Sequence, residues 1–193
     1  MKKIVLASNN KHKIKEFREI LTDYEIVSLE DIGFLDDIVE DGDSFLENSL
    51  IKAKAVDKHL KENNLDYEII AEDSGLCVPS LNGEPGIYSA RYAGDHNDQA
   101  NRDKLIANLK DKEDKSAYFI AQIVYYHDDT YDAVDGKTYG VIIDEERGSK
   151  DFGYDCIFLS DDLEKTFGEA TEEEKNKVSH RGRAIKKLLE IIK

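Results

Sequence analysis

The stretch "KKIVLASNNKHKIKEFREILTD", Lys2 to Asp23, predicts how this chain begins to fold. It opens with a continuous apolar run rich in β-branched residues, which is typical of a strand buried on both faces. After a polar turn, Ile14, Phe17 and Ile20 recur at helical spacing. The turn, "SNNKHK", offers amides, a hydroxyl and lysines that suit a phosphate, but a turn that only reverses the chain would accept the same letters.

The rest of the chain alternates strands with helices, then becomes rich in strands, and ends in a helix. We expect strands at 24–29, 67–75, 116–127 and 137–144, and helices at 44–64, 97–110 and 171–193. Ser44 and Glu47 are spaced as a capping box for the long helix. This order predicts a mixed α/β fold. Because no repeat or linker interrupts it, we expect one domain over residues 1–193.

Composition limits the classes of partner. Apolar residues make up 40% of the chain, charged residues make up 36%, and the net charge is −15. Such acidity argues against binding polymeric nucleic acid or an anionic membrane, but it leaves room for a small phosphorylated ligand. The first apolar run is too short for a secretory signal, and no run approaches the length of a membrane span. We therefore expect a cytoplasmic protein, whose two distant cysteines, Cys77 and Cys156, form no disulfide framework or zinc site.

Two carboxylates end the expected strand at 67–75, within "AEDSGL". Adjacent carboxylates are costly to bury unless a cation or a basic group compensates them. Because side chains alternate along a strand, Glu72 and Asp73 should point to opposite faces. A solvated acidic turn would have the same letters, so these residues alone leave both interpretations open.

Two later segments could carry chemistry, and the first of them suits a purine. In "DFGYD", 151–155, two aromatic residues flank a glycine that allows a flat ligand to approach, and Asp155 can accept a proton from a ring nitrogen. The segment "EEEKNKVSHRGRAIKK", 172–187, gathers basic residues in an acidic protein. A glycine turn and a charged surface helix explain these letters equally well. Nucleotide-binding glycine loops, serine nucleophile elbows and zinc motifs do not occur, which leaves carboxylates with a hard cation and basic groups for phosphate.

Taken in order, these segments resemble the inosine triphosphate pyrophosphatase family, from Ile4 to about Leu189. The resemblance lies in six motifs that occur in register: "SNNKHK", "SFLENSLIKAKA", "EDSGL", "GEPGIYSARYAG", "FGYD" and "EEKNKVSHR". It implies a mixed α/β fold with a long twisted central sheet flanked by helices. It also implies two lobes with a nucleotide cleft between them, and a homodimer. Members of the family hydrolyse ITP, dITP or XTP to the monophosphate and pyrophosphate with Mg²⁺.

The resemblance also assigns roles to residues. Asp73 is implied to be the proton acceptor and a metal ligand. Glu40 is our candidate for a second metal ligand, because the family's pre-helix acidic stretch corresponds to 39–42 here. The implied substrate-binding residues are Ser8, Asn9, Asn10, Lys11, His12 and Lys13 around the triphosphate, Ser74 beside it, Phe152, Gly153, Tyr154 and Asp155 in the base pocket, and Lys175, His180 and Arg181 for base and phosphate.

The implied roles suggest how the base is selected, and one residue departs from the family pattern. Arg181 or protonated His180 facing the 6-oxo group would favour deaminated purines over adenine. Cys156 follows Asp155 where the family commonly has proline, so a backbone restraint is lost.

Two alternatives stay open: a related Maf-type pyrophosphatase acting on pyrimidine or modified nucleotides, and a nucleotide sensor without turnover. Retention of Asp73, Ser74 and Lys13 favours an enzyme over the sensor.

Overall fold

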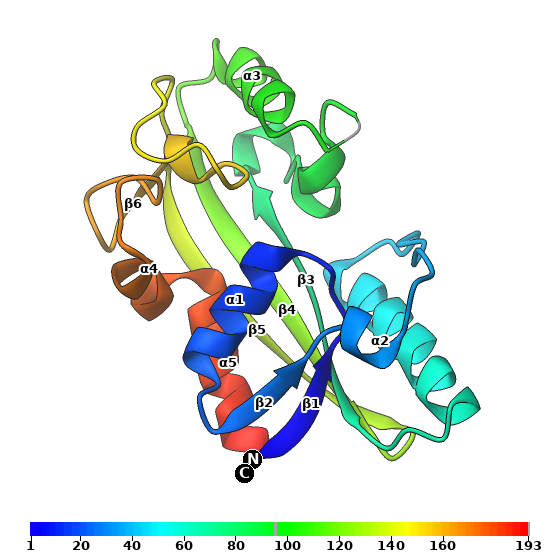
Figure 1. Cartoon of the computed structure of the whole chain (residues 1–193). Coiled ribbons are helices and arrows are strands. Elements are labelled where there is room, and N and C mark those ends of the chain that lie inside the picture. The colour runs from blue at the N-terminus through cyan, green and yellow to red at the C-terminus, as the bar shows by residue number, and fades with distance from the viewer. Residues whose placement is uncertain (95, 193) are drawn as a thin grey trace. The chain divides into compact units, whose positions relative to one another are not determined.

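A computed structural model describes residues 1–94 and 96–192. The elements are β1 (Lys2–Leu6), α1 (Lys11–Ile20), β2 (Tyr24–Val27), α2 (Phe45–Glu62), β3 (Glu68–Cys77), α3 (Asp98–Leu109), β4 (Ser116–His127), β5 (Thr130–Ile142), β6 (Phe158–Ser160), α4 (Glu172–Val178) and α5 (His180–Ile191), with short 3₁₀ turns between some of them (Figure 1). One six-stranded sheet has the order β2-β1-β3-β4-β5-β6. Strand β1 is parallel to β2 and β3, whereas β5 and β6 are antiparallel. The mixed α/β class predicted from sequence is confirmed.

The chain forms two compact units. Unit 1 contains Met1–Asp73, Ala121–Asp135 and the chain from Ala184 onward, and unit 2 contains Ser74–Ile120 and Gly136–Arg183. Strands β3, β4 and β5 and helix α5 contribute residues to both. Each unit has its own apolar cluster of buried side chains, and each is described by itself below. The single bilobed domain stays a prediction.

Unit 1 is a three-layer arrangement built on the alternation of β1. Ile4 and Leu6 face a cluster that includes side chains of α1 and α5, and Val5 faces a second cluster with the apolar side of α2. All three strand residues are 0–1% exposed. The opening apolar run therefore forms a strand buried on both faces, as predicted.

Helix α2 begins at a capping serine, as the sequence predicted. The Ser44 hydroxyl accepts the Glu47 backbone N–H (3.1 Å), but the Glu47 carboxylate accepts the N–H of Asp43 (2.7 Å), one residue before the cap. The expected capping box is therefore only half formed, because the Glu47 carboxylate accepts the N–H of Asp43 rather than that of Ser44. A full capping box occurs instead at α4, between Thr171 and Glu174.

Unit 2 has an aromatic centre. Phe119 packs against Phe158 and Phe167, with ring centroids 4.6 and 6.1 Å away. Helix α3 contributes Leu105 and Leu109, both fully buried. These contacts fix β4, β6 and the segment before α4 around one core.

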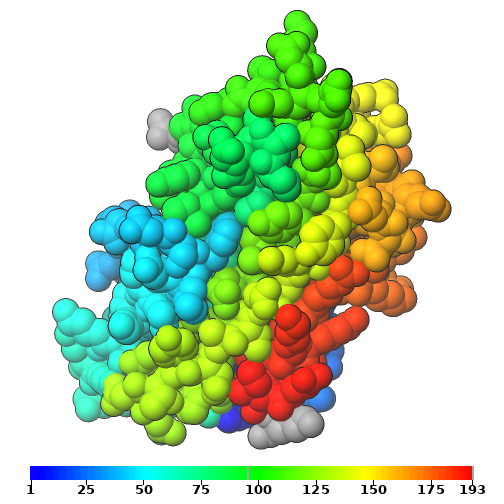
Figure 2. Space-filling model, turned by 180° about the vertical axis from the view of Figure 1, so that it is seen from behind, coloured from blue at the N-terminus to red at the C-terminus, as the bar shows by residue number. Residues whose placement is uncertain are grey.

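Two expected elements differ from the structure. The strand expected at 137–144 begins at Thr130, because Asp128 and Asp129 take positive φ values (47° and 59°) that suit a two-residue hairpin turn after β4. In Figure 2 this hairpin lies beside the C-terminal part of α5, where Lys187 pairs with Asp135 at 3.3 Å.

The single helix expected at 171–193 is two helices, α4 and α5, separated at Ser179. Ser179 has an extended backbone, and its hydroxyl accepts the Gly182 N–H at 3.0 Å. A Cβ at Gly182 would lie 2.0 Å from the Asn176 carbonyl oxygen, so the second helix starts against the backbone of the first. Residue 182 must be small for this break to form.

Candidate functional site

The polar turn between β1 and α1 first stabilises itself. The Ser8 hydroxyl accepts the N–H of Asn10 at 3.1 Å. The Asn10 side chain then accepts the N–H groups of His12 and Lys13 at 3.0 and 3.2 Å, which caps α1. Ser8 and Asn10 thus hold the turn in shape and define where the other side chains of the motif point.

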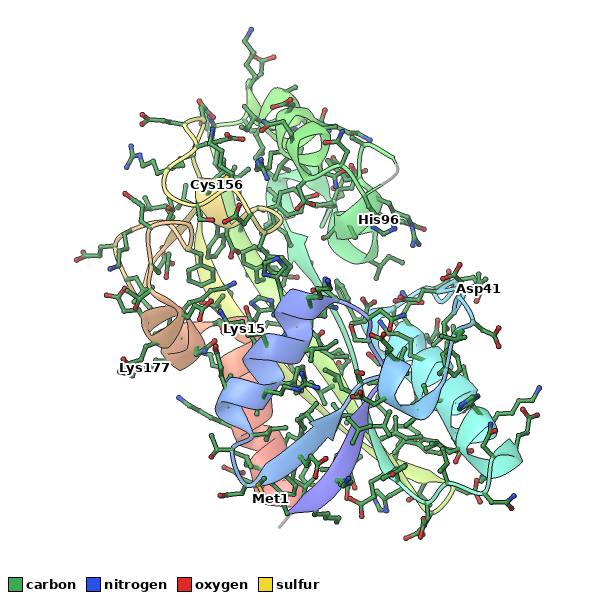
Figure 3. All side chains as sticks on the ribbon, viewed as in Figure 1. Met1, Lys15, Asp41, His96, Cys156 and Lys177 are labelled. Atoms are coloured by element: carbon green, nitrogen blue, oxygen red, sulfur yellow. The ribbon has the colours of Figure 1, made fainter. Side chains whose placement is uncertain are left out.

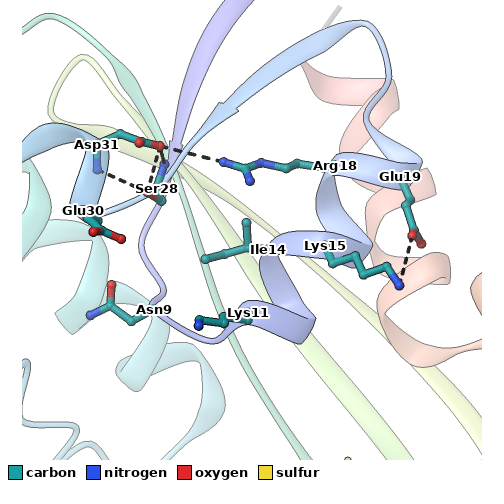
Figure 4. Close-up of a pocket in the computed structure, with 9 residues that line it drawn as sticks. All are labelled: Asn9, Lys11, Ile14, Lys15, Arg18, Glu19, Ser28, Glu30 and Asp31. Atoms are coloured by element: carbon teal, nitrogen blue, oxygen red, sulfur yellow. Dashed lines mark hydrogen bonds and ion pairs between the residues drawn. The ribbon is translucent and has the colours of Figure 1, made fainter.

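Those side chains diverge. Lys13 Nζ lies 2.9 Å from Glu72 Oε2, and the Glu72 side chain is buried in unit 1. The His12 side chain is exposed. Asn9 and Lys11 instead line a cavity of about 530 Å³ between α1 and the segment that follows β2, which Figure 4 shows. That cavity is also lined by Ile14, Lys15, Arg18, Glu19, Ser28, Glu30 and Asp31. The six-residue motif is therefore split, with Lys13 on one side of the turn and Asn9 and Lys11 on the other.

Asp73 is a buried carboxylate held by helix α2. It is 8% exposed, and its Oδ2 accepts the Asn48 amide at 3.1 Å. Lys52, one helical turn further, has its Nζ 3.9 Å from Asp73 Oδ1 and 2.8 Å from Glu40 Oε2. Burial raises the pKa of Asp73, while Lys52 and Lys13 act in the opposite direction. The arrangement suits a group that accepts a proton more readily than an exposed aspartate does.

Glu72 and Asp73 point to opposite faces, as the alternation along β3 predicted. Glu72 contacts Lys13 of α1, whereas Asp73 contacts Asn48 of α2. Both carboxylates are at most 8% exposed. The interpretation as a solvated acidic turn is therefore wrong, because each carboxylate is buried against a basic or amide side chain.

The donor set near Asp73 fits a hard cation. Within residues 1–94 and 96–192, the structure has no group of three or more His, Cys, Asp and Glu side chains placed so that they could hold a metal ion together. Mg²⁺, however, keeps several waters and takes only one or two carboxylates besides substrate phosphates. Lys52 ties Glu40 to Asp73, so positive charge is already stabilised between these two oxygen donors. Glu40 and Asp73 are thus chemically suited to hold such an ion.

Unit 2 holds most of the other predicted residues. Lys175 Nζ lies 2.7 Å from Asp155 Oδ2, and the two residues are 8% and 7% exposed. The same ammonium lies 4.9 Å from the centre of the Phe152 ring. Lys177, two residues on, lies on the outer side of α4 instead (Figure 3). The structure therefore brings Phe152, Asp155 and Lys175 together as one polar and aromatic group.

The remaining unit 2 residues are fixed by packing. Arg181 is 1% exposed, and one of its terminal nitrogens donates to the Ser74 hydroxyl at 3.2 Å. The His180 ring stacks on Phe119 with a centroid distance of 4.9 Å and an angle of 15°. These contacts set the positions of both side chains at the start of α5.

The "FGYD" turn is tied to neighbouring segments. The Tyr154 hydroxyl donates to the Ser89 carbonyl at 2.7 Å, and burial raises the pKa of Tyr154. Gly153 has φ +51°, and its N–H donates to Asp98 at 3.0 Å. At Cys156, where the family commonly has proline, the carbonyl accepts the Arg147 N–H at 2.8 Å and the residue is fully buried. A hydrogen bond thus restrains this backbone, and both cysteines are free thiols, as expected.

Asn48 and Lys52 were not predicted as site residues. Both lie within "SFLENSLIKAKA", four residues apart on one face of α2, and they are 1% and 7% exposed. The signal was a pair of polar residues at helical spacing among apolar neighbours. Such a pair indicates buried polar contacts, but the sequence does not say to what.

The comparisons with known proteins agree with one another. A model of the Ham1 family matches residues 4–191. A dITP/XTP pyrophosphatase of Clostridium perfringens is 48% identical, with 100% of this chain and 98% of that protein covered. A dITP/XTP pyrophosphatase of Bacillus subtilis is 44% identical, with the same two coverages.

Solved structures are similar over the same length. The Staphylococcus aureus Ham1 protein has a TM-score of 0.86 and 40% identity, covering 99% of this chain and 98% of that one. A HAM1 protein from Coxiella burnetii has a TM-score of 0.87 and 35% identity, covering 100% and 98%. In the part of the chain that the structure describes, helices are too short or too polar to cross a membrane.

Proposed function

This chain belongs to the Ham1 family, and we propose that it hydrolyses ITP, dITP and XTP to the nucleoside monophosphate and pyrophosphate. The family and the fold support this proposal. The observation that carries it is the full-length likeness to two proteins named dITP/XTP pyrophosphatase. The proposed role is to remove deaminated purines from the nucleotide pool. We further propose a cytoplasmic homodimer, as the sequence resemblance implies.

In the proposed reaction, water attacks one phosphorus of the triphosphate and pyrophosphate leaves. Asp73 accepts the proton from that water, a role that the raised pKa of the buried carboxylate supports. Lys13 binds the triphosphate by moving from Glu72, to which it is paired at 2.9 Å. Ser8 and Asn10 hold the proposed phosphate-binding turn in shape through their hydrogen bonds to its backbone, whereas the side chains of Asn9 and Lys11 line the cavity beside α1.

Unit 2 supplies base recognition in this proposal. Phe152 and Tyr154 offer flat apolar surfaces, Gly153 allows close approach, and Asp155 accepts a hydrogen bond from the purine. Lys175, His180 and Arg181 donate to the 6-oxo group or to phosphate, and Ser74 contacts the substrate. Donors facing the 6-position favour hypoxanthine and xanthine, because adenine presents an amino group there.

We propose Mg²⁺ as the cofactor, held by Asp73 and Glu40. When bound, the ion neutralises charge on the phosphate oxygens during the displacement. The chain's own contribution is to keep both carboxylates near Lys52, which lies 2.8 Å from Glu40 and 3.9 Å from Asp73.

A nucleotide panel with product identification tests the proposal. With Mg²⁺, ITP, dITP and XTP should each give the monophosphate and pyrophosphate, and ATP should react at least about tenfold more slowly, because one well-placed hydrogen bond discriminates by that much or more. Release of orthophosphate with the diphosphate contradicts the pyrophosphatase mechanism. Faster turnover of pyrimidine triphosphates would favour the Maf-type alternative, and tight binding of ITP without product would favour a sensor.

A further inference from the structure

The Asn48 side chain connects two parts of unit 1 through the two ends of one amide. Its Nδ2 donates to Asp73 Oδ2 at 3.1 Å, and its Oδ1 accepts the backbone N–H of Gly42 at 2.9 Å. Asn48 is 1% exposed. The orientation of the amide is fixed chemically, because a carboxylate accepts and a backbone N–H donates. One buried side chain therefore links β3, α2 and the loop before α2.

The helix that carries Asn48 is itself anchored. The next residue, Ser49, is fully buried, and its hydroxyl donates to the Gln122 carbonyl of β4 at 3.1 Å. Lys52 lies on the same face of α2 and pairs with Glu40 and Asp73. The amide of Asn48 thus sits on a rigid support beside the carboxylate it contacts.

The loop before α2 packs directly on this amide. A Cβ added at Gly42 would lie 2.8 Å from Asn48 Oδ1 and 2.8 Å from the Glu47 Cβ. Glu40 and Asp41 belong to this loop, and Asp41 is marked in Figure 3. Because residue 42 must lack a side chain, the amide and the loop keep one fixed register relative to Asp73.

We propose that Asn48 is a positioning residue that fixes the orientation of the Asp73 carboxylate and holds the Glu40 loop beside it. The proposal rests on the proposed pyrophosphatase function. The groups facing Asp73 have separate roles: Lys52 and Lys13 supply positive charge, Glu40 supplies negative charge, and Asn48 supplies direction without charge. The terminal torsion of an aspartate is soft, so a carboxylate without such a partner samples many orientations. A misplacement of about 1 Å costs roughly a hundredfold in rate.

Two substitutions separate positioning from simple structural support. Asn48→Ala removes both hydrogen bonds without adding charge. Asn48→Asp keeps an acceptor for the Gly42 N–H, loses the donor to Asp73 and places a second carboxylate beside it, so kcat is compared on the plateau of the pH profile, above the pKa that the added charge raises. Positioning predicts that both variants lose roughly tenfold or more in kcat for ITP, with KM within about threefold. Structural support predicts that Asn48→Asp recovers the activity that Asn48→Ala loses. A folded Asn48→Asp enzyme with the kcat of the wild type would overturn the proposal.

Asn101 provides a matched control in unit 2. It is also 1% exposed, and its amide accepts the Ala93 N–H at 2.7 Å and donates to the Ala90 carbonyl at 3.1 Å. Asn101→Asp therefore makes the same chemical change at an equally buried site whose partners are backbone groups. We expect its kcat to stay within about twofold of the wild type. A loss equal to that of Asn48→Asp would assign both effects to general destabilisation and would overturn the proposal.

A measurement without turnover tests the contact itself. In ¹⁵N NMR spectra, Asp73→Ala should shift the side-chain amide signals of Asn48 and speed their hydrogen exchange, and it should leave those of Asn101 in place. Unchanged Asn48 signals would overturn the proposal. Because this readout needs no substrate, it separates failure of the positioning contact from failure of the pyrophosphatase assignment, which the nucleotide panel judges.

Discussion

Two buried aspartates, one in each unit, are equally shielded but differently compensated. Asp73 of unit 1 and Asp155 of unit 2 are 8% and 7% exposed. Asp155 has the Lys175 ammonium at 2.7 Å, whereas the Lys52 ammonium lies 3.9 Å from Asp73 and the closer partner is the neutral Asn48 amide at 3.1 Å. The difference in partner, rather than in burial, separates the two sites.

The difference has a chemical consequence. A carboxylate in a short buried ion pair is stabilised in its charged form and serves as a fixed hydrogen-bond acceptor. For Asp73, burial raises the pKa, and this effect outweighs the opposite effects of Lys52 and Lys13. Asp73 therefore suits proton transfer, whereas Asp155 suits recognition.

Exchanging each aspartate for asparagine should split the kinetic effects. We expect Asp73→Asn to lower kcat for ITP by roughly 10²- to 10⁴-fold with nucleotide binding still detectable, because general-base catalysis contributes about that much. Asp155→Asn should instead raise KM, with a smaller change in kcat. Steady-state pyrophosphate release and ITP binding by calorimetry measure both. Equal losses of kcat in the two variants would remove the distinction between the aspartates.

Much of the fold could be predicted from periodic patterns. The run Lys2–Leu6 and the apolar spacing through Phe17 indicated β1 and α1 correctly, because both depend on local burial. The break at Ser179 could not be predicted, since it depends on the close approach of Gly182 to the Asn176 carbonyl. The early start of β5 required the hairpin turn at Asp128 and Asp129, whose residues do not mark a turn as strongly as asparagine-glycine does.

The sequence predicted which residues belong to the candidate site better than it predicted which of them contact one another. The opposite orientations of Glu72 and Asp73 followed from strand alternation. The partners of Asp73 did not, because Asn48 and Lys52 reach it from a helix 21 or more residues away in the chain. Likewise, the turn Ser8–Lys13 could be recognised, but its division between Lys13 and the cavity lined by Lys11 depends on where α1 begins.

Removing the cation of the tight pair should cost more stability than removing an exposed one. Lys175→Met removes the ammonium that lies against the buried Asp155 carboxylate, and we expect the free energy of unfolding to fall by about 3–5 kcal/mol. Lys177→Met is the control: Lys177 pairs with Glu173 at 2.6 Å, but the two side chains are 68% and 80% exposed. Its cost should stay within about 0.5 kcal/mol. Urea unfolding that shows equal, small costs would mean that Asp155 is not strongly dependent on Lys175.

The smallest effect concerns the half-buried pair of Lys165 and Glu174 in unit 2 and its pH dependence. Lys165 and the Thr171 N–H lower the pKa of Glu174 from 4.5 to about 2. A depressed pKa means that this stabilisation is present above about pH 4.5 and is lost as the pH falls toward about 2.

Glu174→Gln keeps an acceptor for the capping box but removes the charge. The difference in melting temperature between wild type and this variant should therefore shrink as the pH is lowered from 6 to 3. Glu113→Gln, on the exposed segment after α3, controls for the loss of a surface carboxylate. A difference that stays constant with pH would show that Lys165 does not stabilise the charged form of Glu174. In that case, of the two short ion pairs compared in unit 2, only the buried one at Asp155 would contribute to stability.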